Sequence, residues 1–332
     1  MVKMYDLNLA LFDGAPNTNV TTQTGSGKDL SPEMKTFYDK TLITLAEGSL
    51  VHDQFAQKKP IPKNGGKTIE FRKFNQLPKL TTPLTEGVTP DGQSISVTKQ
   101  EATVSQYGGY ATLSDMLELT AIDNIIVEAT KAIASQAGRS LDTITREVLC
   151  GGTNVVYSGG KSARSALDAT CVIKAADIKK AKTILERQDA PMIGDSYVCI
   201  IHPDVASDLM DDPKWVDADN YQQKGNLFKG EIGMLYGVRF VKSTNAKIFG
   251  GAGASGLNVY ATIVLGEGAY GTTEIEGGGL QHFVKQKGSG GTTDPIDQRS
   301  TVGWKATKVT ERLIEQYMVR IESTSTYNGD AN

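Results

Sequence analysis

The sequence has little of what disulfide-rich, metal-binding or membrane-spanning proteins need. Its 332 residues include three cysteines and three histidines, without the spacing of a metal site. No apolar run approaches the ~20 residues of a membrane span, and Met1–Asp6 lacks the apolar core of a signal peptide. The net charge of −3 gives no nucleic-acid or membrane-surface signal. The cysteines are odd in number and far apart, so we expect them reduced and buried: Cys150, Cys171 and Cys199.

Sequence patterns of enzymes are also missing, and the near matches lack the required context. Gly251–Gly256 has the letters GxGxxG, but a strand pattern follows where a dinucleotide-binding motif needs a helix, so we expect a hairpin loop. Gly160–Ser162 resembles the end of a phosphate-binding loop, but Val155 stands in place of the first glycine. His202 follows an apolar strand and is expected to be a strand-end residue, not a ligand. We therefore predict no catalytic residue, no cofactor and no metal site, and a protein that is not an enzyme.

The longest helical pattern in the chain follows a short strand pattern. The strand, Gln106–Leu113, is rich in aromatic residues and glycine, and the helix runs from about Ile122 to Leu149. Thr120 and Asp123 fit a capping box, and Gly151–Gly152 fits a left-handed stop. At ~1.5 Å per residue, this spine helix would span about 40 Å. Apolar residues recur at steps of three and four, which predicts one buried stripe: Ile122, Ile126, Ala129, Ile133, Ala137, Leu141, Ile144 and Val148.

The residues ahead of the spine helix predict an arm, a helix and a long ribbon. Residues 1–30 carry almost nothing to bury, and 31–56 fit a helix with proline in its first turn. Residues 57–105 contain two strand patterns around a proline- and threonine-rich stretch, which is a two-stranded extension with little core. Two interpretations stay open: a solvated hairpin, or an arm that docks on an acidic surface of a partner. The candidate contact residues are basic: Lys67, Arg72, Lys73 and Lys79.

The C-terminal half alternates between helix and buried-strand patterns. Residues 172–275 contain continuous apolar strands such as Tyr197–His202 and Val259–Leu265, separated by helical patterns. This alternation predicts a compact mixed α/β unit. Strand patterns return at Ser300–Ala306 and Tyr317–Ile321, and we expect both to pair back onto the spine region.

The junction between ribbon and spine helix carries a family resemblance. The residues concerned are Gly87–Pro90, Ser96–Thr98 and Ala102–Tyr110, which lead through Leu113–Asp115 into the helix. This run resembles the major capsid proteins of tailed double-stranded DNA phages. The resemblance implies an α+β chain with the Hong Kong 97-type capsid fold over essentially its whole length. The matching parts would be an N-terminal arm at 1–30, a helix at 31–56, the extended β-loop at 57–105, the peripheral domain with its spine helix at 106–171, the axial domain at 172–275, and the return to the peripheral sheet at 276–332.

This resemblance implies a structural protein that works through its interfaces. Hexamers and pentamers of the chain would build an icosahedral shell around packaged double-stranded DNA, without sequence-specific binding and without a membrane. The protein would belong to the virion and assemble in the host cytoplasm, with portal and decoration proteins as partners and either a separate scaffold protein or none. Some relatives begin with a long scaffolding segment, whereas this chain begins almost directly with the arm. Others cross-link subunits through lysine and asparagine, but no local motif singles out Lys79 and Asn328.

Two alternative functions stay open at the level of sequence. An encapsulin-like bacterial nanocompartment shares the fold and differs in its content, which is a cargo enzyme in place of DNA. An uncharacterised α/β enzyme is the alternative from another class, and the missing motifs count against it. A large closed particle would indicate a shell, and a small discrete oligomer would indicate an enzyme.

Overall fold

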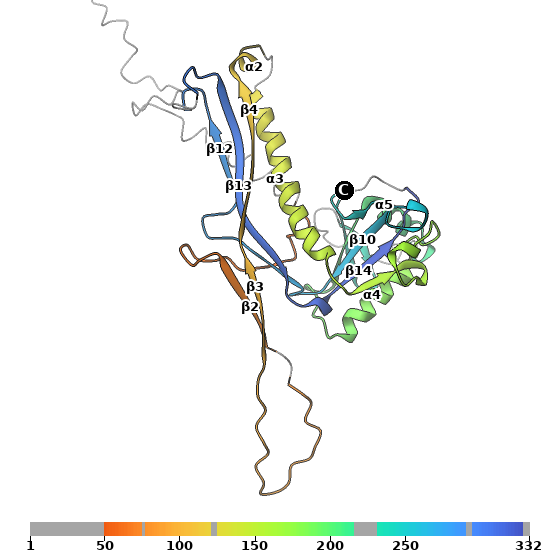
Figure 1. Cartoon of the computed structure of the whole chain (residues 1–332). Helices are drawn as coiled ribbons and strands as arrows, with labels where there is room; N and C mark the ends of the chain where they lie inside the picture. The colour runs from red at the N-terminus through yellow and green to blue at the C-terminus, as the bar shows by residue number, and fades with distance from the viewer. Residues whose placement is uncertain (1–49, 75–76, 121–124, 216–230, 290–293, 328–332) are drawn as a thin grey trace, which may run out of the picture.

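The computed structural model describes residues 50–74, 77–120, 125–215, 231–289 and 294–327. The arm expected at 1–30 and most of the helix expected at 31–56 lie outside these residues. Within them, a rod made of one long helix and a sheet meets a second, more compact unit at an angle, and a long loop projects away from both (Figure 1).

The rod is built on helix α3 (Ile125–Cys150), which is the expected spine helix. It follows strand β4 (Ser105–Ser114) and the short helix α2 (Asp115–Thr120). The hydroxyl of Thr120, one member of the expected capping box, donates to the Met116 carbonyl oxygen at 2.7 Å within α2. Asp123, the other member of the expected capping box, lies outside the described residues.

Helix α3 ends where the paired glycines begin, but the physical reason differs from the expected one. Neither Gly151 nor Gly152 has a positive φ, so the predicted left-handed stop is wrong. A Cβ at either position would lie 2.7 Å from a charged side chain, Arg312 in one case and Glu315 in the other. The Arg312 guanidinium donates to the Val148 carbonyl oxygen at 2.9 Å and satisfies the helix end. The flexible ends of Arg312 and Glu315 thus occupy the space that side chains at these two positions would take.

A five-stranded sheet lies along α3, with the long strand β13 (Arg299–Arg312) at its centre. The Ser300–Ala306 pattern falls in β13, which pairs antiparallel with β4, so the expected pairing with the spine region is confirmed. The remaining strands are β1 (Gln57–Lys58), β11 (Tyr270–Thr273) and β12 (Gln281–Lys285). The buried core between helix and sheet comprises Leu113, Ile133, Ala134, Ala137, Leu141, Val302, Trp304 and Ala306.

The compact unit is a seven-stranded sheet in the order β5-β14-β10-β6-β8-β7, with β9 also paired to β10. Its strands are β5 (Val155–Tyr157), β6 (Tyr197–Ile201), β7 (Glu231–Leu235), β8 (Val238–Lys242), β9 (Ile248–Phe249), β10 (Val259–Leu265) and β14 (Met318–Ser323). Its helices are α4 (Ala175–Arg187) and α5 (Pro203–Met210), with short 3₁₀ turns at Ser158–Gly160, Arg164–Ala166, Ala254–Gly256 and Glu315–Tyr317. Strands β6 and β10 are buried at every position, as their continuous apolar patterns predict.

Two expectations for this unit are settled by strand pairing. The Tyr317–Ile321 pattern predicts pairing with the spine region, but β14 pairs with β10 and β5, so this prediction is wrong. Every residue of β14 is buried, which suits an interior strand of the larger sheet. The glycine run Gly251–Gly256 connects β9 to its antiparallel partner β10, so the expected hairpin loop is confirmed. The boundaries of the capsid domains stay a prediction.

The extended loop begins as a separate two-stranded sheet. Strands β2 (Thr68–Phe74) and β3 (Val97–Thr103) pair antiparallel with Thr68 opposite Thr103. Phe71 and Ala102 are buried at its base, and residues 77–96 beyond the strands are exposed throughout. In Figure 1 this loop points away from α3 and from both larger sheets.

We expect Ile133→Ala to lower the free energy of unfolding of the dispersed subunit by about 2–5 kcal/mol, because it leaves a cavity in the core between α3 and β13. Ser135→Ala, at an exposed position of the same helix, is the control and should change it by less than about 0.5 kcal/mol. Urea unfolding followed by circular dichroism measures both. Equal stability of the two variants would show that the buried stripe of α3 is misplaced.

Candidate functional site

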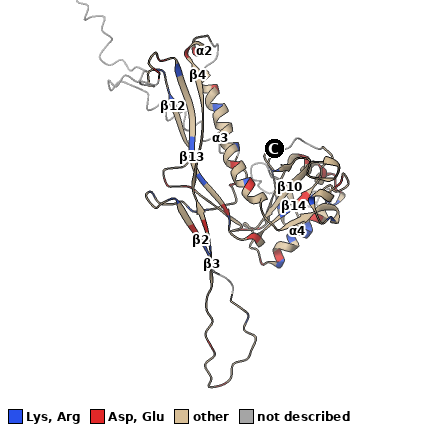
Figure 2. Ribbon diagram, in the orientation of Figure 1, with Lys and Arg blue, Asp and Glu red and all other residues tan. Residues whose placement is uncertain are grey.

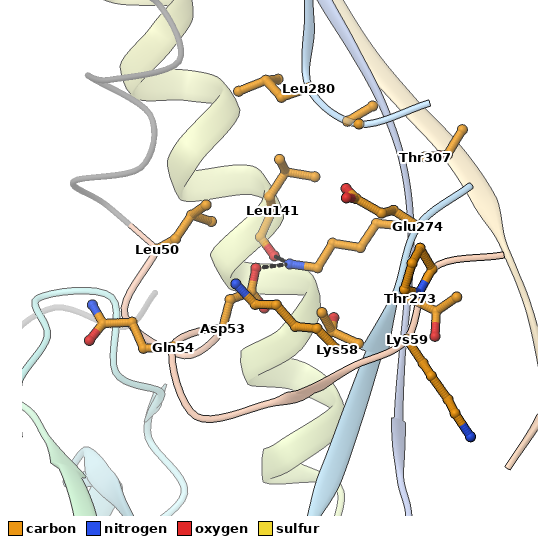
Figure 3. Close-up of a pocket in the computed structure, with 15 residues that line it drawn as sticks. Leu50, Asp53, Gln54, Lys58, Lys59, Leu141, Thr273, Glu274, Leu280 and Thr307 are labelled. Atoms are coloured by element: carbon orange, nitrogen blue, oxygen red, sulfur yellow. Dashed lines mark hydrogen bonds and ion pairs between the residues drawn. The ribbon is translucent and has the colours of Figure 1, made fainter. Parts of the chain in front are cut away.

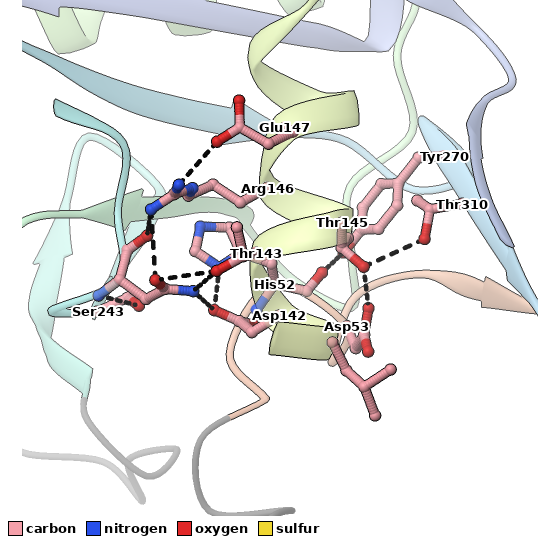
Figure 4. Close-up of polar contacts among 12 residues, drawn as sticks. His52, Asp53, Asp142, Thr143, Thr145, Arg146, Glu147, Ser243, Tyr270 and Thr310 are labelled. Atoms are coloured by element: carbon pink, nitrogen blue, oxygen red, sulfur yellow. Dashed lines mark hydrogen bonds and ion pairs between the residues drawn. The ribbon is translucent and has the colours of Figure 1, made fainter. Parts of the chain in front are cut away.

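A group of buried and half-buried polar side chains lies where the segment 50–56 meets the C-terminal half of α3 (Figure 4). The group joins this segment, the helix, the five-stranded sheet and a loop of the seven-stranded sheet. We call it the polar junction, and its members are His52, Asp53, Asp142, Thr143, Thr145, Arg146, Asn245, Tyr270, Lys308 and Thr310.

One half of the polar junction centres on Asp142, whose carboxylate is fully buried. It accepts from the backbone N–H of His52 at 2.8 Å and from the His52 ring Nδ1 at 2.8 Å. The Nδ2 of Asn245 donates to it at 2.8 Å, and Arg146 Nη1 donates to the Asn245 carbonyl oxygen at 2.9 Å. A buried carboxylate needs such partners, so these bonds link α3 to the chain on either side of it.

The other half centres on Asp53 and reaches the five-stranded sheet. The hydroxyl of Thr145 donates to Asp53 Oδ1 at 2.5 Å, and Lys308 Nζ donates to Asp53 Oδ2. Lys308 also donates to the Leu141 carbonyl oxygen at 2.9 Å. Tyr270 donates its hydroxyl to the carbonyl oxygen of His52, and burial raises the pKa of Tyr270 well above its ordinary value. This half therefore fastens the segment 50–56 to β13 and β11.

Two opposing effects act on the pKa of Asp142. Burial raises it, because the charged form is desolvated, whereas the hydrogen bond and charge of His52 and the hydrogen bond from Asn245 lower it. The lowering effects prevail, so its pKa lies below the ordinary value of 3.8. The ionised form is therefore the one that the folded chain stabilises.

The polar junction lacks the geometry of a catalytic site. His52 beside Asp142 resembles two members of a Ser-His-Asp triad, but both side chains are fully buried. The Nε2 of His52 has no hydrogen-bond partner among the described residues, so no hydroxyl or thiol of these residues is placed to be activated. Across the same residues, no group of His, Cys, Asp and Glu side chains could hold a metal ion. The hydrogen bonds of the arrangement fasten these elements together.

A cavity of about 520 Å³ lies beside the polar junction (Figure 3). Leu50, Leu141 and Leu280 form its apolar wall, and the Asp53–Lys308 ion pair closes one side. The exposed Lys58 and Lys59 stand on the segment that borders it. Of the charged residues that line it, Asp53 and Lys308 pair with each other, and Lys58, Lys59 and Glu274 also border the cavity.

The predicted contact residues occupy different parts of the ribbon. Figure 2 shows the Lys and Arg residues of the described chain in blue and its Asp and Glu residues in red. Lys67 precedes β2, and Lys79 lies on the loop beyond it; both are exposed. Arg72 is 63% exposed, and its Nε donates to Glu70 Oε1 at 2.6 Å, so its charge is partly balanced within its own strand. The backbone of Lys73 pairs with Thr98 in the ribbon. The structure therefore does not gather the four cations into one site.

The predicted spine core is buried to different degrees. Ile133 and Leu141 are buried, Ile126 and Ile144 are half-buried against the same core, and Ile122 lies outside the described residues. All three cysteines are free and buried, as expected.

Sequence reasoning missed the polar junction, although α3 carries a signal for it. Asp142, Thr145 and Arg146 continue the three-four spacing that begins at Ile133. Polar residues at stripe positions indicate that a buried face changes from apolar to hydrogen-bonded contacts. Their partners could not be found in the same way, because His52 and Lys308 are far from them in sequence.

The arrangement of α3, the two larger sheets and the projecting loop is the architecture of a known class of protein. It matches solved viral shells: the capsid of Ralstonia phage GP4 (16% identity, 84% of this chain and 88% of that chain, TM-score 0.65), the cyanophage Pam1 capsid (13%, 83% and 89%, 0.65) and the capsid of cyanophage P-SCSP1u (14%, 84% and 89%, 0.60). At these identities the likeness shows the fold, so the expected α+β, Hong Kong 97-type fold is confirmed.

The sequence model of the phage capsid protein family matches residues 98–312, so the chain belongs to the phage capsid protein family. The expected resemblance to the major capsid proteins of tailed phages is confirmed. No curated protein matches the chain. The protein is a structural major capsid protein that forms an icosahedral shell with copies of itself, as a component of the virion. The nanocompartment alternative is not favoured.

Among the described residues, no helix is both long and apolar enough to span a bilayer.

We expect Asp142→Asn to reduce the dependence of stability on acid pH. A carboxyl whose pKa is lowered by folding contributes stability above its unfolded-state value near 3.8. That contribution is lost as the pH falls through the folded-state pKa, and the asparagine variant has no such contribution to lose. Chemical denaturation of the dispersed subunit between about pH 5 and pH 2 should therefore show a shallower decline. Asp211→Asn, at an exposed carboxylate, is the control; equal slopes for wild type and Asp142→Asn would refute the assignment.

Proposed function

We propose that this chain encloses packaged double-stranded DNA in a phage head, through hexamers and pentamers of identical subunits. The observation that carries the proposal is the match of residues 98–312 to the phage capsid protein family. The virion shell of a tailed phage surrounds DNA and need not bind a particular sequence. The net charge of −3 agrees with enclosure without strong attraction to phosphates.

The extended loop gives physical support to assembly. Residues 77–96 expose five large apolar side chains and contact none of the three sheets' cores: Leu77, Leu80, Leu84, Val88 and Ile95. A two-stranded ribbon is marginally stable in water unless another surface supports it. A neighbouring copy can provide that surface, and such head-to-tail contacts close into rings when the rotation between copies is suitable.

The basic base of the ribbon is proposed as a second contact. Arg72 and Lys73 would face an acidic surface of an adjacent subunit, with Lys67 and Lys79 on either side of them in the sequence. Exposed ion pairs of this kind contribute only about 0–1 kcal/mol each, so their effect depends on repetition around the particle. The arm at 1–30 would add a further contact between subunits.

The finer parts of the proposal concern partners and chemistry. The chain would use a separate scaffold or none, together with portal and decoration proteins, and would assemble in the host cytoplasm. It would have no enzymatic activity, cofactor, metal or membrane contact.

The direct test is the size and content of particles formed by the full chain. We expect sedimentation and electron microscopy of the protein from phage-infected cells to show closed icosahedral particles whose content is nuclease-protected DNA. A small discrete oligomer would refute the shell, and particles filled with a single cargo enzyme would refute the phage-head assignment.

We expect the double reversal Arg72→Glu and Lys73→Glu to reduce the yield of closed particles, because like charges would face each other at every copy of the contact. Lys179→Glu with Lys180→Glu changes the net charge equally at an exposed face of α4 and serves as the control. Particle counts at low and moderate salt measure the effect. Normal yield from the Arg72 and Lys73 variant would count against docking by the ribbon base.

A further inference from the structure

Lys308 carries a buried amine, and its ion pair with Asp53 is more enclosed than comparable pairs of the molecule. Its side chain is 8% exposed and that of Asp53 is 12% exposed. In each of the other lysine–carboxylate pairs between described residues, at least one side chain is 32% exposed or more. Burying two charges is costly, because the pair gives up its contact with water. An amine and a carboxylate that condense to an amide lose both charges.

The polar atoms of this pair each have a hydrogen-bond partner (Figure 3 and Figure 4). The Thr145 hydroxyl donates to Asp53 Oδ1 at 2.5 Å, and its oxygen lies 3.1 Å from the Thr310 hydroxyl oxygen. Lys308 Nζ donates to the other carboxylate oxygen, Oδ2, and to the Leu141 carbonyl oxygen at 2.9 Å. One carboxylate oxygen therefore faces a neutral donor, whereas the other faces the amine.

We propose that Lys308 and Asp53 become joined by an amide bond between their side chains once the chain has folded. The bond that forms is between Lys308 Nζ and Asp53 Cγ, and the bond that breaks is between Cγ and Oδ2, which leaves as water. This modification is a condensation within one subunit, and it consumes no oxidant, reductant or second substrate. It does not depend on the proposed shell function, since a dispersed subunit contains both groups.

The hydrogen bonds in place supply a path for every proton of this reaction. One proton passes from the Lys308 ammonium to Oδ2 along the bond that joins them, which leaves a neutral amine beside a neutral carboxyl group. The amine lone pair then attacks Cγ, and negative charge develops on Oδ1, where the Thr145 hydroxyl stabilises it. A second proton passes from the nitrogen to Oδ2, the bond from Cγ to Oδ2 breaks, and one water leaves.

The amide keeps the hydrogen bonds that the ion pair already makes. Oδ1 becomes the amide carbonyl oxygen and still accepts from Thr145, and the remaining N–H still donates to the Leu141 carbonyl oxygen. The two buried charges disappear, and with them their desolvation cost. The released water has room, because the cavity of about 520 Å³ is lined by Asp53 and Lys308.

Fixed contact in the fold supplies what an amine and a carboxylate lack in free solution. Well-oriented groups within one molecule react as if present at effective concentrations of about 10⁵–10⁸ M. Lys308 stands on β13 and Asp53 on the segment 50–56, and the polar junction holds both in contact.

The amide would change how the chain is connected. Asp53 and Lys308 are 255 residues apart, so the bond closes a covalent loop that contains α3 and strands β5 to β10. A cross-link of this kind stabilises a fold mainly by restricting the unfolded chain, as a disulfide does. A pull on the residues ahead of Leu50 would also reach β13 through a covalent bond.

Mass spectrometry of the denatured full chain tests the bond. The wild type should be lighter than its sequence mass by one water, and a protease digest should contain one branched peptide that joins positions 53 and 308. Lys308→Arg should have its full sequence mass, because a guanidinium group stays protonated and is not a nucleophile. Asp53→Asn should lose one ammonia in place of the water, because nitrogen is then the leaving group. On denaturing gels the wild type should migrate ahead of Lys308→Arg, because a closed loop makes the unfolded chain more compact.

A second lysine–aspartate pair is the matched control for burial. Lys161 Nζ lies 2.9 Å from Asp168 Oδ2, but these two side chains are 35% and 41% exposed. The Thr170 hydroxyl donates to Asp168 Oδ1 at 2.5 Å, so this pair also has a threonine donor. Lys161→Arg should therefore lose one water as the wild type does, and the peptides with Lys161 and Asp168 should be unlinked.

The masses are measured on the dispersed subunit and on closed particles, freshly purified and after prolonged incubation. A full sequence mass in all of these samples overturns the proposal. A water loss that persists in Lys308→Arg, or a branched peptide at another pair only, overturns it as well. Circular dichroism checks that each variant is folded; if Lys308→Arg does not fold, the wild-type mass and its branched peptide decide alone.

Discussion

The buried face of α3 is the constraint on which the rest of the molecule depends. Its first turns pack apolar residues against β4 and β13, and its last turns present Asp142, Thr145 and Arg146 to the polar junction. Apolar packing tolerates small sliding, whereas buried carboxylates require partners at fixed positions. The polar C-terminal part of the buried face therefore fixes the positions of three elements relative to α3. They are the segment 50–56, the five-stranded sheet and the loop at Asn245.

The surface of the molecule exposes large apolar side chains that no described part of the chain covers. The extended loop exposes Leu80 and Leu84, and the face of the sheet opposite α3 exposes Tyr110 and Phe283. A monomeric protein would be expected to cover or replace such residues, because large exposed apolar patches promote association. In a capsid protein the same residues are free to meet another copy. An interior held together by buried hydrogen bonds, with exposed apolar side chains on the surface, suits a subunit that folds first and assembles afterwards.

The corrections share one physical cause, which is that local patterns do not identify distant neighbours. Gly151 and Gly152 look like a left-handed helix stop, but their missing side chains make room for Arg312 and Glu315. Tyr317–Ile321 has an ordinary strand pattern, and only its pairing with β10 and β5 places it in the larger sheet. In both cases the residue types were informative, and partners more than 50 residues away decided their role.

The sequence by itself determined the spine helix, the buried strands β6 and β10, the ribbon and the family, because periodicity, apolar runs and a recognisable junction are local properties. It also indicated the absence of nucleotide-binding and hydrolase motifs. Only the tertiary structure decided that His52 and Lys308 meet the polar stripe of α3, that β14 joins the seven-stranded sheet, and that Tyr110, Gly303 and Phe283 line up across three strands. These arrangements depend on strand register and on side chains brought together from remote segments, which no local pattern specifies.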